Sequence, residues 1–127
     1  MKTIFTIISV CFLNLITVAQ ELNGYPLNEI PAKYVEIEYR PKSLFTKSYC
    51  VVDYGQIAKY TSASDLKKFA AIKENDELKE FKSEIEMLNY LAKHGFKILE
   101  TYQDIVTNTD HEVTAEKRKY LLENLNY

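Results

Sequence analysis

The segment from Ser83 to Gly95 constrains the fold more than any other, because it marks both ends of a helix. Ser83 and Glu86 have the spacing of a capping box, in which each side chain bonds the backbone amide of the other residue. Apolar residues recur at steps of three and four and predict one apolar stripe: Ile85, Leu88, Leu91 and Ala92. Gly95 supplies the left-handed conformation that ends many helices. This stretch therefore predicts an amphipathic helix that needs another element to cover it.

Two segments before this helix have the pattern of β-strands. In residues 34–39, apolar side chains alternate with glutamates, which predicts a half-buried strand. Residues 47–54 form a second β-rich run, and the strand-breaking residues 40–43 lie between the two. This separation favours an antiparallel hairpin whose loop is longer than the tight two-residue type.

Residues 56–82 are ambiguous. Ser64 and Asp65 can cap a helix that runs through Leu66, Phe69 and Ile72, and composition slightly favours this reading. The alternative is two short strands, around residues 70–72 and 78–81, with a turn between them.

The part after Gly95 predicts a strand over residues 96–106 and a turn over residues 107–111. Residues 116–124 have good helix propensity. A strand centred on residues 119–122 that pairs with the preceding one is the alternative.

Four short segments of the sequence, taken in their order along the chain, form a recognisable pattern. They lie within residues 28–37, 45–56, 81–91 and 95–102, and Tyr120-Leu121-Leu122 follows them. In this order they resemble a group of uncharacterised small exported proteins of Bacteroidetes-type bacteria. The resemblance implies an α+β domain with a small antiparallel sheet of about four main strands, one amphipathic helix on one face and a ββαββ-like order.

The same resemblance favours short strands within residues 56–82 and a strand at the C-terminus. Two features depart from the group: Phe96 replaces the usual Trp, and residues 111–119 look more helical. The group has no assigned activity, so the resemblance implies a fold and no function.

The first nineteen residues have the features of a cleaved secretion signal. Lys2 gives the positive start, residues 4–18 are uncharged and mostly apolar, and small or slim residues precede Gln20. The run is interrupted by Asn14 and is shorter than the roughly 20 apolar residues that a spanning helix needs. A lipid anchor on Cys11 is disfavoured by the bulky residue before it. We expect export to the periplasm or the medium, with no stable membrane anchor after signal removal.

The mature chain has the size of one domain. Removing 19 of the 127 residues leaves about 108. We expect a signal at 1–19, an irregular N-terminal lead-in at 20–32 and a single α+β domain at 33–127. Loss of Lys2 leaves 15 of the 16 basic residues against 18 acids, a net charge of about −3. This balance argues against nucleic acid, which calls for a basic stripe, and against binding to anionic lipid.

Cys50 is the obvious candidate nucleophile, because it is the one cysteine that remains after signal removal. It lies in the apolar run 49–52, where cysteine behaves as a small buried hydrophobe. A pair with His94 or His111 also needs an orienting group and an exposed thiol of low pKa, and the nearest cation in sequence is Lys47. We therefore expect no catalytic residue here.

The acidic residues show no metal-binding or glycosidase pattern. Residues 110–112 are adjacent, with Glu100 and Asp104 on the preceding strand, and adjacent ligands rarely converge on one ion. Glu36 and Glu38 share a strand face, with no sign of the cleft that raises one carboxyl pKa. The three glycines are too few for a phosphate-binding loop. We expect no cofactor and no metal.

Tyrosine is the unusual feature of the composition, with ten tyrosines and no tryptophan. Tyrosine suits recognition surfaces because it combines apolar area with a hydroxyl. Tyr34, expected opposite the apolar face of its strand, and Tyr60 are the candidate interaction residues; most other tyrosines suit the sheet and core.

We expect a non-enzymatic protein-interaction domain that binds another envelope protein or itself through a sheet face or edge. A small-ligand or glycan-binding module that uses tyrosine side chains is the alternative. A small hydrolase that uses Cys50 or His94 is less favoured.

Overall fold

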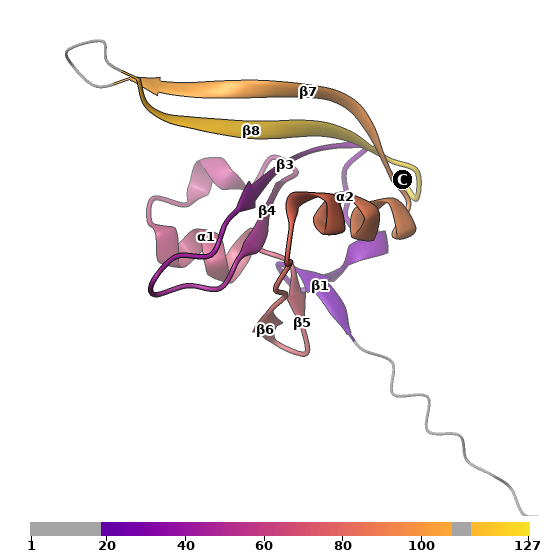
Figure 1. Ribbon diagram of the computed structural model, residues 1–127. Coiled ribbons are helices and arrows are strands. Elements are labelled where there is room, and N and C mark those ends of the chain that lie inside the picture. Colours follow the sequence, from indigo (N-terminus) through magenta and orange to yellow (C-terminus); the bar gives the residue numbers. More distant parts are fainter. Residues whose placement is uncertain (1–18, 108–112) are drawn as a thin grey trace, which may run out of the picture.

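The computed structural model of the protein describes residues 19–107 and 113–127 (Figure 1). These residues form two α-helices and two antiparallel sheets of four strands each, which confirms the predicted α+β class and antiparallel pairing. The predicted signal, apart from Ala19, and most of the predicted turn at 107–111 lie outside the described residues. Within the described ranges, no helix is both long and apolar enough to cross a bilayer.

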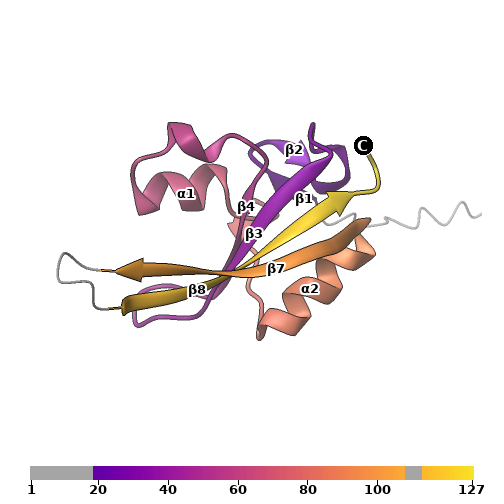
Figure 2. The same cartoon turned by 90° about the horizontal axis from the view of Figure 1, so that it is seen from above.

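The main sheet has the order β4-β3-β8-β7. Its strands are β3 (Tyr34–Arg40), β4 (Tyr49–Asp53), β7 (Phe96–Thr107) and β8 (Val113–Asn124). The predicted strands at 34–39, 47–54 and 96–106 are confirmed, and the ambiguous C-terminus is a strand. β7 and β8 have twelve residues each and extend past the other two strands as a long hairpin (Figures 1 and 2).

The second sheet has the order β2-β1-β5-β6 and consists of very short strands. β1 (Gln20–Leu22) and β2 (Tyr25–Pro26) turn through two residues of positive φ, Asn23 and Gly24. The 3₁₀ turn η1 (Leu27–Glu29) follows. Two short strands and a 3₁₀ turn thus lie where the sequence predicted an irregular lead-in at 20–32. Strands of two or three residues leave too little alternation to be recognised in a sequence.

Residues 56–82 contain both structures that the sequence offered as alternatives. After the 3₁₀ turn η2 (Ile57–Lys59), helix α1 (Ala63–Phe69) is followed by strands β5 (Lys73–Glu74) and β6 (Glu77–Leu78). The helix is capped by Ser62, whose hydroxyl accepts from the Asp65 amide at 3.1 Å, and not by the expected Ser64.

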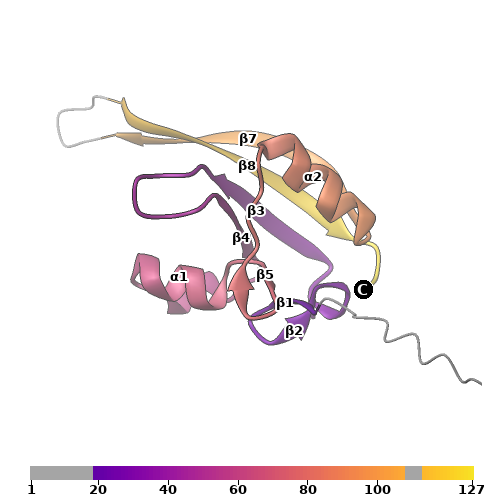
Figure 3. The same ribbon diagram turned by 60° about the horizontal axis from the view of Figure 1, so that its bottom comes forward.

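The element order differs from the ββαββ-like prediction. α1 and the strands β5 and β6 lie between β4 and the second helix, so the prediction of a single helix is also wrong. The two helices lie apart, with α1 beside the β4 side of the molecule and α2 beside the β7–β8 side (Figure 3).

Helix α2 (Glu84–Lys93) begins at Ser83 as predicted, and the Ser83 hydroxyl accepts from the Glu86 amide at 3.1 Å. The Glu86 carboxylate accepts from the Lys82 amide instead of the Ser83 amide. Met87 and Leu91 are the fully buried residues of the helix, whereas Ile85 is 65% exposed. The predicted stripe is therefore wrong at Ile85 and at Ala92, which is also exposed, because the packed face includes Met87.

The main core lies against one face of the main sheet and joins both sheets to α2. It takes side chains from β1, η1, β3, β4, α2, β7 and β8, and its largest fully buried residue is Phe81. A smaller cluster contains Tyr49, Val51, Ala70 and Ala71, with Leu66 of α1 packed against it. Together they fix the β4 edge of the sheet against α1 and leave the β7 edge on the other side.

Candidate functional site

A charged pocket of about 210 Å³ opens on the face of the main sheet opposite the core. Glu36 and Glu38 line it, because they alternate along β3 with the buried Val35 and Ile37. Ile57 also lines it, from η2. The two glutamates expected on an open polar face thus lie in a shallow pocket.

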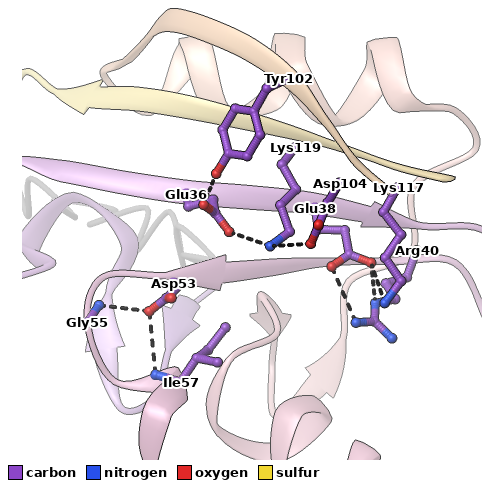
Figure 4. Close-up of polar contacts among 10 residues, drawn as sticks. All are labelled: Glu36, Glu38, Arg40, Asp53, Gly55, Ile57, Tyr102, Asp104, Lys117 and Lys119. Atoms are coloured by element: carbon purple, nitrogen blue, oxygen red, sulfur yellow. Dashed lines mark hydrogen bonds and ion pairs between the residues drawn. The ribbon is translucent and has the colours of Figure 1, made fainter. Parts of the chain in front are cut away.

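Lys119 joins three strands across this pocket (Figure 4). Its Nζ lies 2.9 Å from Glu36 Oε1 on β3 and 3.3 Å from Asp104 Oδ2 on β7. Hydrogen bonding to Glu36 raises the pKa of Lys119, against the effect of partial burial. The Tyr102 hydroxyl donates to the other Glu36 carboxylate oxygen. This network ties the long hairpin to β3.

Glu38 is the second junction of charges. Arg40 Nε lies 2.9 Å from Glu38 Oε1 and Lys117 Nζ lies 3.9 Å from the same oxygen. Asp53 Oδ1 accepts from the amides of Gly55 at 2.8 Å and Ile57 at 3.4 Å and so shapes the turn after β4. These ion pairs are partly buried, and the charges of the pocket largely neutralise one another. We interpret the pocket as a strand-joining network.

Cys50 and His94 do not contact each other. Cys50 is fully buried, and its thiol has the Val51 carbonyl oxygen as its hydrogen-bond partner at 3.7 Å. Burial, with a smaller contribution from the charge of Glu38, raises the pKa of the thiol, which opposes thiolate formation. His94 Nδ1 donates to the Tyr90 carbonyl oxygen at 2.8 Å, and its Nε2 contacts the Gln20 side chain. His111 lies outside the described residues.

The native protein is expected to resist thiol reagents at Cys50. The thiol is inaccessible and its pKa is raised, so labelling with a maleimide should occur only as fast as the protein unfolds. Mass spectrometry of residues 20–127 with and without urea measures this. Rapid labelling of the folded protein would contradict the burial and reopen the hydrolase hypothesis.

The two candidate tyrosines lie on different parts of the molecule. Tyr34 is 51% exposed on β3, and Lys33 Nζ lies 5.3 Å from its ring centre. Tyr60 follows η2 and is half-buried, stacked on Phe69 with ring centres 5.0 Å apart. Among the described residues they line no common pocket, so they do not form one binding surface.

Tyr60 lines a different hollow, of about 400 Å³, together with Tyr25 and Tyr54. The rings of Tyr25 and Tyr54 meet edge to face, with centres 6.3 Å apart. Sequence reasoning missed this group because its members come from β2, from the residue after β4 and from the residue after η2. The high tyrosine content was the only signal of it.

β7 forms one edge of the main sheet and carries exposed apolar side chains. Ile98, Leu99 and Ile105 are each between 44% and 53% exposed. β8 pairs with its inner edge, and within the described ranges no strand pairs with its outer edge. The register shifts between Ile98 and Glu100, so a bulge interrupts the first third of the strand. Residues 100–105 then pair regularly with 121–116.

Comparisons with protein-family models, with curated proteins and with solved structures find no match. The described residues also contain no group of three or more His, Cys, Asp or Glu side chains placed to hold a metal ion. The features of the described residues that bear on function are the β7 edge and the hollow lined by tyrosines.

Proposed function

We propose that this protein is an exported, non-enzymatic protein-interaction domain that binds an extended polypeptide along the outer edge of β7. The observation that carries the proposal is the free edge of a twelve-residue strand. Such an edge offers a row of backbone N–H and C=O groups to a partner strand. Export rests on the N-terminal sequence pattern, and the partner is another envelope protein or a second copy.

The composition of β7 supports this role. Edge strands are commonly protected by proline, by charged side chains or by short length. β7 has twice the usual length of about 5–6 residues. It has no proline, and its charged residues are Lys97, Glu100 and Asp104, of which Asp104 is paired with Lys119. The bulge at Leu99 disturbs its beginning, which leaves residues 100–105 as the regular edge.

The edge is also held rigid before binding. Asp104 on β7 is joined through Lys119 to Glu36 on β3. Arg118 on β8 lies 3.2 Å from Glu84 on α2, which ties the hairpin to the helix. A strand that is already extended loses little conformational freedom on pairing, so more of the pairing free energy remains for binding.

The substitution Ile105→Lys is expected to abolish pairing at this edge and to leave the fold intact. Ile105 is 53% exposed, and a lysine on an edge strand opposes strand addition by its charge. For self-pairing, light scattering on residues 20–127 should show a concentration-dependent dimer that the variant loses. For a different partner, a photo-crosslinking residue at position 105 in the native cells should yield a discrete product.

Ile85→Lys is the matched control, because Ile85 is an isoleucine on α2 that is 65% exposed. The Ile85→Lys variant should dimerise like the unmodified protein. With the photo-crosslinking residue at position 105, it should also give the same crosslinked product. A protein that stays monomeric at every concentration and gives no more product from position 105 than from position 85 would rule out the proposal.

A further inference from the structure

The hollow lined by Tyr25, Tyr54 and Tyr60 lies apart from the β7 edge, since Tyr54 directly follows β4 at the opposite edge of the sheet. We propose that this hollow binds carbohydrate, as one or two sugar rings of a glycan. The inference does not depend on the proposed edge pairing.

The aromatic side chains provide the platform that a sugar ring needs. A pyranose has C–H-rich faces that pack on aromatic rings and a rim of hydroxyl groups that need hydrogen-bond partners. Tyr25 is 42% exposed and is held edge-on by Tyr54, with an interplanar angle of 86°. Phe69 stacks on one face of Tyr60, which fixes this ring as well. The rings are thus positioned without being buried.

Polar atoms of both kinds stand beside these rings. Asn23 Nδ2 donates to the Tyr54 hydroxyl oxygen at 2.8 Å, so the hydroxyl keeps its own proton for a ligand. The other amide atom, Asn23 Oδ1, accepts no hydrogen bond from the described residues and is an acceptor for a ligand hydroxyl. Lys59 supplies a donor, and it is the only charged residue that lines the hollow.

Local backbone geometry holds these groups before any ligand binds. Asn23 has a φ of +52° in the tight turn between β1 and β2, a conformation that asparagine tolerates. Gln56 accepts from the Tyr54 amide at 2.7 Å and donates to the Val52 carbonyl oxygen at 2.7 Å, which fixes the loop after β4. A pre-formed site of this kind is typical of small-ligand pockets.

The shape and lining favour sugar over other small ligands. The volume of about 400 Å³ lies within the usual range of about 300–1,000 Å³ for ligand sites. An apolar ligand needs enclosing aliphatic walls, and Pro31 is the one aliphatic side chain in this lining. Because Lys59 gives the hollow a single positive charge, an acidic sugar should bind more tightly than its neutral counterpart.

Titrations of ¹⁵N-labelled residues 20–127 test the inference by NMR. The probes are cello-, xylo- and laminari-oligosaccharides as neutral glycans and oligogalacturonate as the acidic one. At least one should shift the amide signals of residues 23–25 and 54–60. Tyr25→Ala should then weaken binding by about tenfold or more, because the open ring is lost. Lys59→Gln should weaken binding of the acidic oligosaccharide more than binding of the neutral ones.

Tyr34→Ala is the matched control, since Tyr34 is an exposed tyrosine outside the hollow. It should leave the affinity unchanged. Absence of shifts with all four probes, or equal losses in Tyr25→Ala and Tyr34→Ala, would overturn the inference. Ile105→Lys should keep full glycan affinity, so failure here and failure of the edge proposal are separate results.

Discussion

Phe81→Ala is expected to lower the free energy of unfolding of residues 20–127 by about 4 kcal/mol. Phe81 lies in the main core and has the largest fully buried side chain there. Its ring meets the Tyr90 ring edge to face, with centres 5.3 Å apart. Truncation removes this buried apolar area and leaves a cavity that the surrounding strands fill only in part. A domain of this size has about 5–15 kcal/mol of stability, so the loss is a large fraction of the total.

The backbone around Phe81 makes collapse of this cavity harder. The Ser48 hydroxyl donates to the Phe81 carbonyl oxygen, and the Tyr39 hydroxyl donates to it at 3.4 Å. These bonds hold the segment that links the second sheet to α2 against β3 and against the start of β4. The backbone at residue 81 is therefore held by hydrogen bonds from β3 and from the residue before β4. It can move little to fill the cavity that the missing ring leaves.

Phe45→Ala provides the control, because Phe45 lies in the loop between β3 and β4 and is 94% exposed. Urea unfolding followed by circular dichroism should place its stability within about 0.5 kcal/mol of the unmodified protein. Similar losses for the two variants would show that the core is not centred on Phe81.

Local signals account for the parts of the fold that the sequence predicted. The α2 cap depends on Ser83 and Glu86, three residues apart, and the helix end depends on one glycine of positive φ. β3 alternates because one of its faces is buried and the other lines the charged pocket. Each signal needs no knowledge of distant segments, so each is visible in a single sequence.

The features that the sequence did not predict depend on contacts between segments that are distant in the chain. β1 and β5 are short strands that pair with each other across about fifty residues of sequence, with Glu21 opposite Lys73. Ile85 belongs to the apolar stripe by spacing and is exposed, because the orientation of α2 is set by Met87 and Leu91 against the sheet. No periodicity within either segment contains this information.

The two proposed surfaces could not be predicted from the sequence either, because both depend on how distant segments pack together. The free edge follows from the strand order β4-β3-β8-β7, which places β7 outermost. The hollow brings together residues 23–25, 54 and 59–60. Tyr60, a candidate interaction residue in the sequence, is half-buried, and its neighbours in the hollow follow only from the tertiary structure.

The strand order also permits both surfaces to be occupied at once. β4, which leads into Tyr54, is one edge of the main sheet, and β7 is the other. A glycan in the hollow and a polypeptide at β7 would thus lie on opposite sides of the domain. If both proposals hold, the domain would join a glycan to a protein partner, and each single variant above disables one side only.

Asn124→Asp is expected to destabilise the protein by about 3 kcal/mol at pH 7, although the two side chains have the same shape. Asn124 is 3% exposed at the end of β8. Its Nδ2 donates to the carbonyl oxygens of Ile30 at 3.2 Å and Ala32 at 3.1 Å, and its Oδ1 accepts from the Asn126 amide at 3.0 Å. The variant replaces the donor with a charged oxygen that faces two carbonyl oxygens.

The pH dependence separates this electrostatic effect from a simple packing defect. In the folded variant the neutral carboxyl is favoured, because its O–H can donate to one of the carbonyl oxygens, so its folded pKa lies above the unfolded value of about 3.9. The unfolded state then releases its proton first as pH rises, and the stability deficit grows from about pH 4 upward. Urea unfolding at pH 4 and pH 7 should show the smaller deficit at pH 4. Asn28→Asp, at an exposed position of η1, is the control. Its free energy of unfolding should stay within about 0.5 kcal/mol of that of the unmodified protein at both pH values. A deficit in Asn124→Asp that does not change with pH would mean that the amide does not bridge the N-terminal segment to β8.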